Sequence, residues 1–287
     1  PVPSGNTFGP DRQIAYAGIA SATTLADNPV NGTEGDDDLS GTAGNDLIMP
    51  LGNTGNDVIR GSAGQDTIVL SQSQTGDFYD LVYDSLAAGI DLDLDQDSGR
   101  FMIHKGALGS DNFIDGFRAV NYETGDGVYV VGTAQADSFR VNAGSDTWIG
   151  LSGGAGIDSY TIESADIVRI TFNAPYAGAR PGQGAIVNLS TGVISNDGYG
   201  NAEQITMTPG GARVEIEGTL QNDFLVGSVG NDRFIGLLGN DTIQGGAGFD
   251  EVRYDRSAHT SGVDLNLQTG TVLGTGFTDQ LSGIEAA

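Results

Sequence analysis

Aspartate recurs at a fixed place in short glycine-rich repeats of this chain. Arrays of nine-residue units begin at Gly32, Gly132 and Gly218, and each of the eleven units carries Asp at its sixth position and an apolar residue at its eighth. Glycine fills the fourth position in nine of the units, with Gln135 and Gln221 as the exceptions. The aspartates at position six are Asp37, Asp46, Asp57, Asp66, Asp137, Asp146, Asp158, Asp223, Asp232, Asp241 and Asp250.

These residue types have the chemistry of a calcium site. Ca²⁺ is a hard cation that takes about six to eight oxygen ligands, largely carboxylates and backbone carbonyls. Glycine lets the backbone curl so that its carbonyl groups point inward, and Asp reaches the ion from a fixed place in every turn. We therefore predict Ca²⁺ as the cofactor, with the position-six aspartates as ligands. The position-four glycines expected to join them are Gly44, Gly64, Gly156, Gly230, Gly239 and Gly248.

Repeats that lie two apart are expected to stack with an ion between them. Two short insertions, at 50–51 and 150–152, interrupt the first and second arrays, whereas the third array is unbroken. Gln135 and Gln221 replace turn glycines, so weaker binding is expected there. A further site is expected at an array end through Asp77. The predicted pairs are Asp37 with Asp57, Asp46 with Asp66, Asp137 with Asp158, Asp223 with Asp241, and Asp232 with Asp250.

A second interpretation of the repeats is that Asp and Gly build turns without metal, the carboxylates accepting backbone hydrogen bonds. Stacked carboxylates a few ångströms apart repel each other unless a cation neutralises them. The formal net charge of −26 is then the charge of a protein without its calcium. Because an ion bound only by the folded state stabilises that state, folding is expected to be coupled to calcium.

The elements that must position these ligands are short strands. The apolar residue at position eight points inward from a strand too short to bury much by itself, so stacking must supply the core. A β-like stretch follows each array, as in the match between 89–94 and 262–267. We therefore predict an all-β fold of three modules, 32–131, 132–217 and 218–287, preceded by a linker or cap at 1–31. The last module is expected to be truncated, with further modules in the parent protein.

The nonapeptide GGxGxDxUx resembles the calcium-binding repeat of the RTX (hemolysin-type) family. The resemblance extends over about 32–287 and implies a right-handed parallel β-roll, in which six residues form a turn and three a strand. It implies that successive repeats alternate sides, with calcium between repeats on one side. It also implies a secreted bacterial protein, exported by type I secretion and found outside the cell or at its surface.

Composition excludes several other classes of function. The chain has no Cys, and its 38 acidic residues (30 Asp and 8 Glu) stand against 12 basic ones, of which only Lys105 is lysine. Nucleic acids and anionic membranes require basic surfaces, so neither is an expected partner. No apolar run approaches the roughly 20 residues of a membrane span, and no signal peptide is visible. The expected location outside the cell therefore rests on the predicted calcium binding.

Catalytic patterns are weak, and we predict no catalytic residue and no enzyme in this chain. The pattern G-x-S-x-G occurs at 150–154, between two repeats rather than at a strand–helix turn. No H-E-x-x-H zinc motif is present. The predicted function is a calcium-binding segment that folds outside the cell and acts as a rigid structural or accessory module. One alternative is the accessory region of an exported enzyme that degrades polysaccharide or protein.

A second alternative is an adhesin or surface-layer segment that binds glycan or cells. It depends on 163–182, a stretch longer than its counterpart in the third module, which carries Arg169, Phe172, Tyr176 and Arg180. Loops on rigid scaffolds often carry recognition. Aromatic and arginine side chains could contact an acidic polysaccharide, although a plain surface hairpin also fits this stretch.

Overall fold

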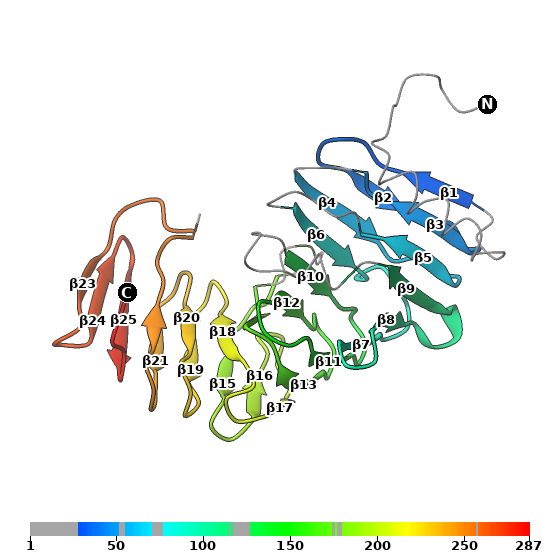
Figure 1. Cartoon of the computed structure of the whole chain (residues 1–287). Helices are drawn as coiled ribbons and strands as arrows, with labels where there is room; N and C mark the ends of the chain where they lie inside the picture. The colour runs from blue at the N-terminus through cyan, green and yellow to red at the C-terminus, as the bar shows by residue number, and fades with distance from the viewer. Residues whose placement is uncertain are drawn as a thin grey trace.

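Two long β-sheets pack face to face along an elongated molecule, with β1 near one end and β23–β25 at the other (Figure 1). The computed structural model describes residues 28–51, 55–70, 77–114, 116, 127–173, 176, 180–256 and 258–287. Residues 1–27, most of the predicted linker or cap, lie outside this part; Asn28–Asn31 form β1, which pairs in parallel with β3.

Within the described residues the smaller sheet has nine strands, and all neighbouring strands in it pair in parallel. Its order follows the chain, which is expected when each strand stacks on the strand of the repeat two units earlier. The strands are β2 (Asp38–Ser40), β4 (Gly55–Arg60), β6 (Asp77–Val82), β10 (Gly127–Val131), β12 (Trp148–Ser152), β14 (Ile167–Thr171), β18 (Arg213–Glu217), β20 (Arg233–Ile235) and β22 (Glu251–Val252).

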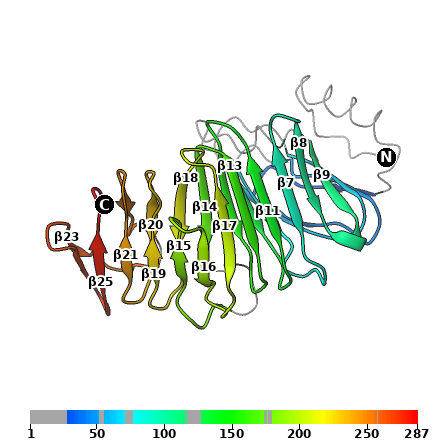
Figure 2. The same cartoon turned by 90° about the horizontal axis from the view of Figure 1, so that it is seen from below.

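The larger sheet has sixteen strands in the part of the chain that the structure describes, and it combines parallel repeat strands with antiparallel insertions (Figure 2). Its spatial order is β1 (Asn28–Asn31), β3 (Asp46–Met49), β5 (Asp66–Val69), β9 (Ser110–Ile114), β8 (Arg100–His104), β7 (Asp91–Asp95), β11 (Ser138–Asn142), β13 (Ser159–Ser164), β17 (Glu203–Met207), β16 (Val193–Asn196), β15 (Ile186–Asn188), β19 (Phe224–Val226), β21 (Thr242–Gln244), β25 (Phe277–Ser282), β24 (Thr271–Gly274) and β23 (Asp264–Asn266).

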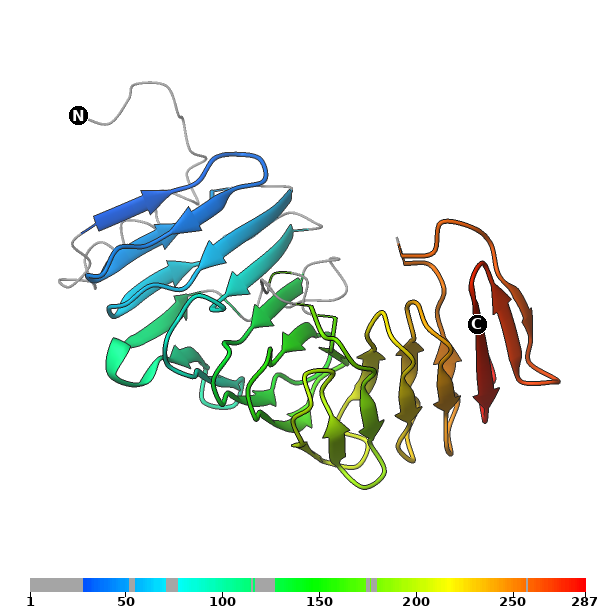
Figure 3. The same cartoon turned by 180° about the vertical axis from the view of Figure 1, so that it is seen from behind.

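Each insertion is a three-stranded antiparallel unit. The units are β7–β8–β9, β15–β16–β17 and β23–β24–β25, and the last strand of each pairs in parallel with a preceding repeat strand. Figure 3 shows the third unit beside β21 from behind. A short 3-10 turn, η1 (Gly106–Leu108), connects β8 to β9. Both sheets run through all three predicted modules, and the module boundaries stay a prediction.

The core lies between the two sheets and includes ten of the eleven side chains at position eight of the repeats, the exception being Trp148. All eleven are buried, because alternation along each short strand turns them away from solvent. The described chain thus confirms the expected all-β parallel β-roll. None of the helices in the described residues is long and apolar enough to cross a membrane.

Candidate metal centre

The turns bring together all five predicted pairs of aspartates. In each pair the backbone N–H of the first Asp donates to the Oδ1 atom of the second, so the repeats stack as expected. The N–O distances are 3.0 Å for Asp37–Asp57, 3.0 Å for Asp46–Asp66, 2.8 Å for Asp137–Asp158, 2.9 Å for Asp223–Asp241 and 2.8 Å for Asp232–Asp250.

On the side of the larger sheet, each pair continues into an acid that lies outside the nonapeptides. Glu203 and Asp279 come just before the residues of β17 and β25 that first pair with β13 and β21, and Asp111, the second residue of β9, pairs with Asp66. We call the first member of each row its leading acid, the second its middle acid and the third its end acid. The first stack is Asp46, Asp66 and Asp111; the second stack is Asp137, Asp158 and Glu203; the third stack is Asp223, Asp241 and Asp279.

The end acids were missed from the sequence, and all three are at least 97% buried. The backbone N–H of Asp158 donates to Glu203 Oε1 at 3.3 Å, and that of Asp241 donates to Asp279 Oδ1 at 2.9 Å. A signal was available: each end acid stands two residues before an apolar residue, as position six stands before position eight. On the other side of the roll, the backbone N–H of Asp250 donates to Oε2 of the exposed Glu285 at 2.9 Å.

The carboxylates of the leading acids accept hydrogen bonds from their own turns. In five of the described turns the Thr or Ser that follows the first glycine donates its backbone N–H to Oδ2 of the position-six Asp, whereas Ser62 donates its hydroxyl group to Asp66 Oδ2 at 3.2 Å. The backbone hydrogen bond is 2.6 Å from Thr42 to Asp46 and 2.8 Å from Thr219 to Asp223. The hydroxyl group of each threonine also donates to the carboxylate. These carboxylates therefore have backbone and side-chain donors without any ion.

Several of the acids that follow the first acid of a row lack such donors. Oδ2 of Asp158, Asp241 and Asp250 is buried and has no hydrogen-bond partner, and the same is true of Glu203 Oε2. The residue after the first glycine is Gly154, Leu237 or Gly246 in these turns, and all three have positive φ angles (93°, 69° and 101°). The left-handed backbone presents no N–H to the carboxylate there. A buried anionic oxygen without a donor is costly, and a cation is the partner that would compensate it.

Burial and neighbouring carboxylates raise the pKa of these acids strongly. Burial, and then the charge of Asp223, raises the pKa of Asp241 to about 9. Burial, Asp158 and Asp197 raise the pKa of Glu203 to about 9. For the leading acid Asp223 burial raises the pKa only to about 6, because backbone and hydroxyl donors favour the charged form. Asp241 and Glu203 thus have a greater need for positive charge than Asp223.

Backbone carbonyls of neighbouring turns converge at the glycines. A Cβ atom on Gly156 would lie 1.8 Å from the carbonyl oxygen of Gln135, and one on Gly248 would lie 2.3 Å from that of Gly230. Gly64 and Gly239 face the carbonyls of Gly44 and Gln221 in the same way. Only glycine permits this approach, and the same Cβ positions at Gly156 and Gly64 lie 2.6 and 3.1 Å from Oδ1 of Asp158 and Asp66. The role of the carbonyl oxygens as calcium ligands, like that of the aspartates, stays a prediction.

No group of three Asp, Glu or His side chains within the described ranges is arranged to hold a metal by itself. Backbone carbonyls would therefore have to complete a site. Calcium accepts such mixed oxygen ligands at flexible geometry, whereas zinc prefers a closed set of nitrogen and sulfur ligands. The orphaned carboxylate oxygens and the carbonyl rows fit calcium.

The first stack already contains a cation. Lys105 is fully buried, and its Nζ donates to the carbonyl oxygen of Ser62 at 2.7 Å, to Asp66 Oδ2 at 3.0 Å and to Asp111 Oδ1. The hydroxyl of Tyr83 donates to Asp111 Oδ2 at 2.6 Å. The sequence showed Lys105 only as the single lysine, because its partners are distant in the chain.

The prediction for Asp146 is corrected by the structure. Asp146 is exposed and has a positive φ of 62°, while Thr147 is buried and occupies the place in the turn that Asp holds elsewhere. The N–H of Ile167 donates to the carbonyl oxygen of Thr147 at 2.9 Å, as the N–H of Ser159 donates to that of Asp137 at 3.0 Å.

The physical reason is a one-residue slip in the frame of this repeat. Strand β11 continues through Asn142 instead of ending after three residues, so the following turn begins later. Ile149 then faces the main core, while Trp148 packs in a separate cluster with Tyr129 and Val131. The pattern of glycine and aspartate could not show this slip.

Other sequence expectations also change. β6 places Tyr79, and not Asp77, opposite Asp57, and the side chain of Asp77 lies outside the described residues. Ser152, the serine of G-x-S-x-G, is 1% exposed, and the next element after it is the strand β13 and not a helix, so the turn is not a nucleophile elbow. The position-six aspartates other than Asp146 lie where the repeat pattern predicts.

The expected basic, aromatic loop at 163–182 is wrong for two of its residues. Arg169 lies in β14, forms an ion pair with Glu215, and its guanidinium carbon is 5.1 Å from the centre of the Trp148 ring. Phe172 is 5% exposed. The Tyr176 hydroxyl donates to Asp80. Residues 174–175 and 177–179 of this stretch lie outside the described part.

Comparison with known families decides the nature of the repeats. The RTX calcium-binding nonapeptide repeat is matched in four copies, over residues 26–49, 51–72 and 217–252. The chain thus carries RTX calcium-binding repeats over these residues. RTX nonapeptide repeats bind calcium, and the family is typical of secreted bacterial proteins. The second array, which contains the slipped frame, lies outside the matched residues.

Comparisons with whole proteins add little to the family assignment. No curated protein matches the chain. Among solved structures, the chain is similar to the extracellular lipase LipA from Serratia marcescens, with 13% identity and a TM-score of 0.24. The match covers 90% of this chain and 38% of the lipase, so this RTX chain spans well under half of that protein's length.

Proposed function

We propose that this RTX chain is a non-catalytic segment of an exported bacterial protein that folds when calcium enters its stacks. The observation that supports this most directly is the set of buried, unpartnered oxygens on Asp158, Glu203, Asp241 and Asp250. A folded state without cations must hold these carboxylates either unneutralised or protonated, and both are unfavourable near neutral pH.

Calcium concentration then decides where the segment folds. Extracellular calcium modules bind with dissociation constants of about 10⁻⁴–10⁻³ M. Sites of that affinity fill outside the cell and stay empty in a cytosol that is poor in calcium. The chain would cross the export machinery unfolded and become a rigid, elongated element afterwards. Export by type I secretion is part of this proposal.

Calcium titration of the whole chain tests the proposal. The protein is depleted with a chelator, then titrated with Ca²⁺ or Mg²⁺ while circular dichroism and heat are recorded. We expect a gain of β-sheet signal and a release of heat with Ca²⁺ only, because Mg²⁺ demands a tighter octahedral shell and dehydrates reluctantly. A chain that is fully folded in chelator and binds no calcium would contradict the proposal.

A further inference from the structure

The ammonium group of Lys105 marks a cation position within the first stack. Its three oxygen partners are one backbone carbonyl, from Ser62, and the carboxylates of Asp66 and Asp111. Both carboxylates and the lysine are at least 98% buried. A carbonyl and two carboxylates from adjacent turns are also the kind of oxygen set that calcium takes. Here a side chain supplies the positive charge.

In the second and third stacks the middle acid also lies beside the end acid, but no lysine lies with them. In the third stack, Tyr254 donates to Asp279 Oδ2 at 2.8 Å, just as Tyr83 donates to Asp111, but Oδ2 of Asp241 is left without a partner. In the second stack, the unpartnered oxygens are Asp158 Oδ2 and Glu203 Oε2. In both stacks the middle and end acids are therefore two neighbouring buried carboxylates, and at least one of their oxygens has no hydrogen-bond partner.

The lengths of the connections explain the difference. In the first unit, residues 105–109 connect β8 to β9, and Lys105 opens this connection. In the third unit, only residues 275–276 separate β24 from β25. In the second unit the connection at 197–202 is longer but supplies another carboxylate, Asp197, which is 2% exposed. Neither connection provides a cation.

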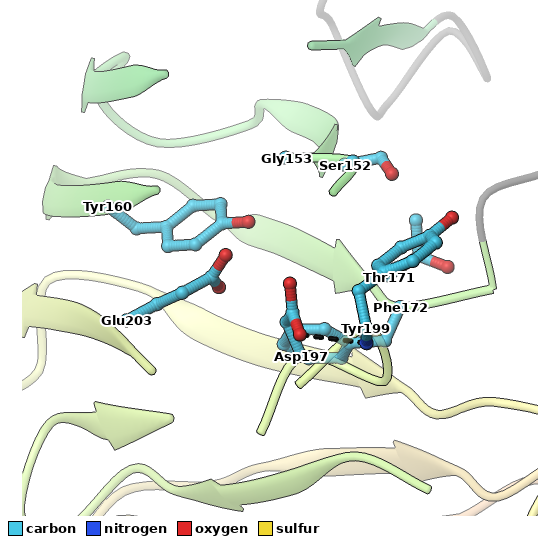
Figure 4. Close-up of a pocket in the computed structure, with 9 residues that line it drawn as sticks. Ser152, Gly153, Tyr160, Thr171, Phe172, Asp197, Tyr199 and Glu203 are labelled. Carbon is cyan, nitrogen blue, oxygen red and sulfur yellow. Dashed lines mark hydrogen bonds between the residues drawn. The ribbon is translucent and has the colours of Figure 1, made fainter. Parts of the chain in front are cut away.

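The second stack opens into a small recess lined by Ser152, Tyr160, Asp197 and Glu203, among others. In Figure 4 the carboxylates of Asp197 and Glu203 and the hydroxyl group of Tyr160 face the same space. Asp197 Oδ1 already accepts the N–H groups of Tyr199 and Asn201, at 2.8 and 2.9 Å. Glu203 Oε2 remains the unpartnered atom in this recess.

We infer that the second and third stacks each bind a calcium ion between the middle and end acids, at the position that the Lys105 ammonium fills in the first stack. The ligands outside the nonapeptides are Glu203 and Asp279. This inference rests on the proposed calcium function and adds sites that the repeat pattern does not contain. It also assigns Lys105 as a tethered cation that makes one step of the first stack independent of calcium.

The test counts calcium ions bound per chain by equilibrium dialysis with radioactive calcium, at a concentration that saturates the unmodified protein. Glu203→Gln and Asp279→Asn are each expected to bind one ion fewer. Lys105→Ala removes the ammonium and leaves room beside Asp66 and Asp111, so it is expected to bind one ion more. Lys105→Met, which keeps the apolar stem, is expected to gain none.

Asp250→Asn separates failure of this inference from failure of the proposed function. If this variant loses calcium while Glu203→Gln and Asp279→Asn bind as much as the unmodified chain, the end acids Glu203 and Asp279 are not ligands and the inference is overturned. If the unmodified chain binds no calcium, the proposed function fails as well. If Lys105→Ala does not fold, the calcium counts of Glu203→Gln and Asp279→Asn still support or overturn the inference.

Discussion

The first and third stacks share a backbone arrangement but balance their charge differently. In both, strand register places a middle acid beside an end acid, and a tyrosine donates to the end acid. In the first stack Lys105 neutralises the pair, whereas in the third stack Oδ2 of Asp241 has no donor. One fold thus offers an internal cation in one place and requires an external one in another.

This difference shows that the calcium requirement need not be uniform along the roll. Stability varies locally in proteins, and regions with uncompensated groups open first. In the first stack Lys105 already neutralises the middle and end acids, while the third stack depends on a cation from solution. The following predictions separate the two stacks, and their expected effects decrease in order.

Neutralising the middle acid should have opposite effects in the two stacks without calcium. Asp66→Asn leaves the buried Lys105 with one carboxylate fewer, so we expect a loss of about 3–5 kcal/mol in the free energy of unfolding. Asp241→Asn removes a buried charge that lies beside Asp223 and Asp279, so stability in chelator should rise. Urea denaturation of both full-length variants in chelator measures this. A loss of stability in Asp241→Asn comparable to that in Asp66→Asn would contradict the comparison.

Removing a turn glycine should affect both stacks alike, because their backbones are equivalent. A Cβ atom would lie 2.2 Å from a carbonyl oxygen at Gly64 and 2.3 Å from one at Gly239, and both residues have positive φ angles (114° and 120°). We expect Gly64→Ala and Gly239→Ala each to lose about 1–3 kcal/mol in calcium. Gly35→Ala, with no atom within 4 Å of its Cβ, is the control and should change little. Thermal denaturation of the three variants would show unequal losses at Gly64 and Gly239 if the turns differ.

The calcium-free protein should become less stable as the pH rises. A carboxylate whose pKa is raised by folding stabilises the folded state when protonated, and this contribution is lost as pH rises through the folded pKa. For Asp241 the window runs from its usual value of 3.8 to about 9, and for Asp111 it ends at about 7. The third stack should therefore continue to lose stability above pH 7, where the first has stopped. Hydrogen exchange of both stacks between pH 5 and pH 8, corrected for intrinsic rates, measures the difference; stability that increases with pH would contradict it.

Asp146 provides the smallest expected effect. The repeat pattern makes it a ligand, but its side chain is exposed and outside the stacking frame. Asn tolerates its left-handed backbone, so Asp146→Asn should keep calcium stoichiometry and change stability by less than about 0.5 kcal/mol. Asp158→Asn in the same array is the matched comparison and should lose calcium. Equal losses in calorimetric titrations would restore Asp146 to the site.

The fold was predictable because nonapeptide spacing ties each inward side chain to a turn aspartate. That regularity placed the position-eight residues other than Trp148 in the core, and repeats two apart in contact. The slip at Asp146 was not predictable, since the extra length of β11 comes from its pairing with β7 and β13. The acids Glu203 and Asp279 lie 45 and 38 residues after their partners Asp158 and Asp241, and the antiparallel units alone bring them there. Lys105 had no sequence signal beyond being a lone lysine.

Hydrogen exchange of the whole chain, with calcium and after chelation, tests the central claim most directly. Calcium at about 100 times its dissociation constant stabilises a site by about 2.7 kcal/mol, which corresponds to roughly a hundredfold change in protection. We predict that amides in β19, β21 and β25 lose protection on this scale when calcium is removed, while those in β3, β5 and β9 retain more of theirs. Equal protection of β19, β21 and β25 with and without calcium would contradict the account.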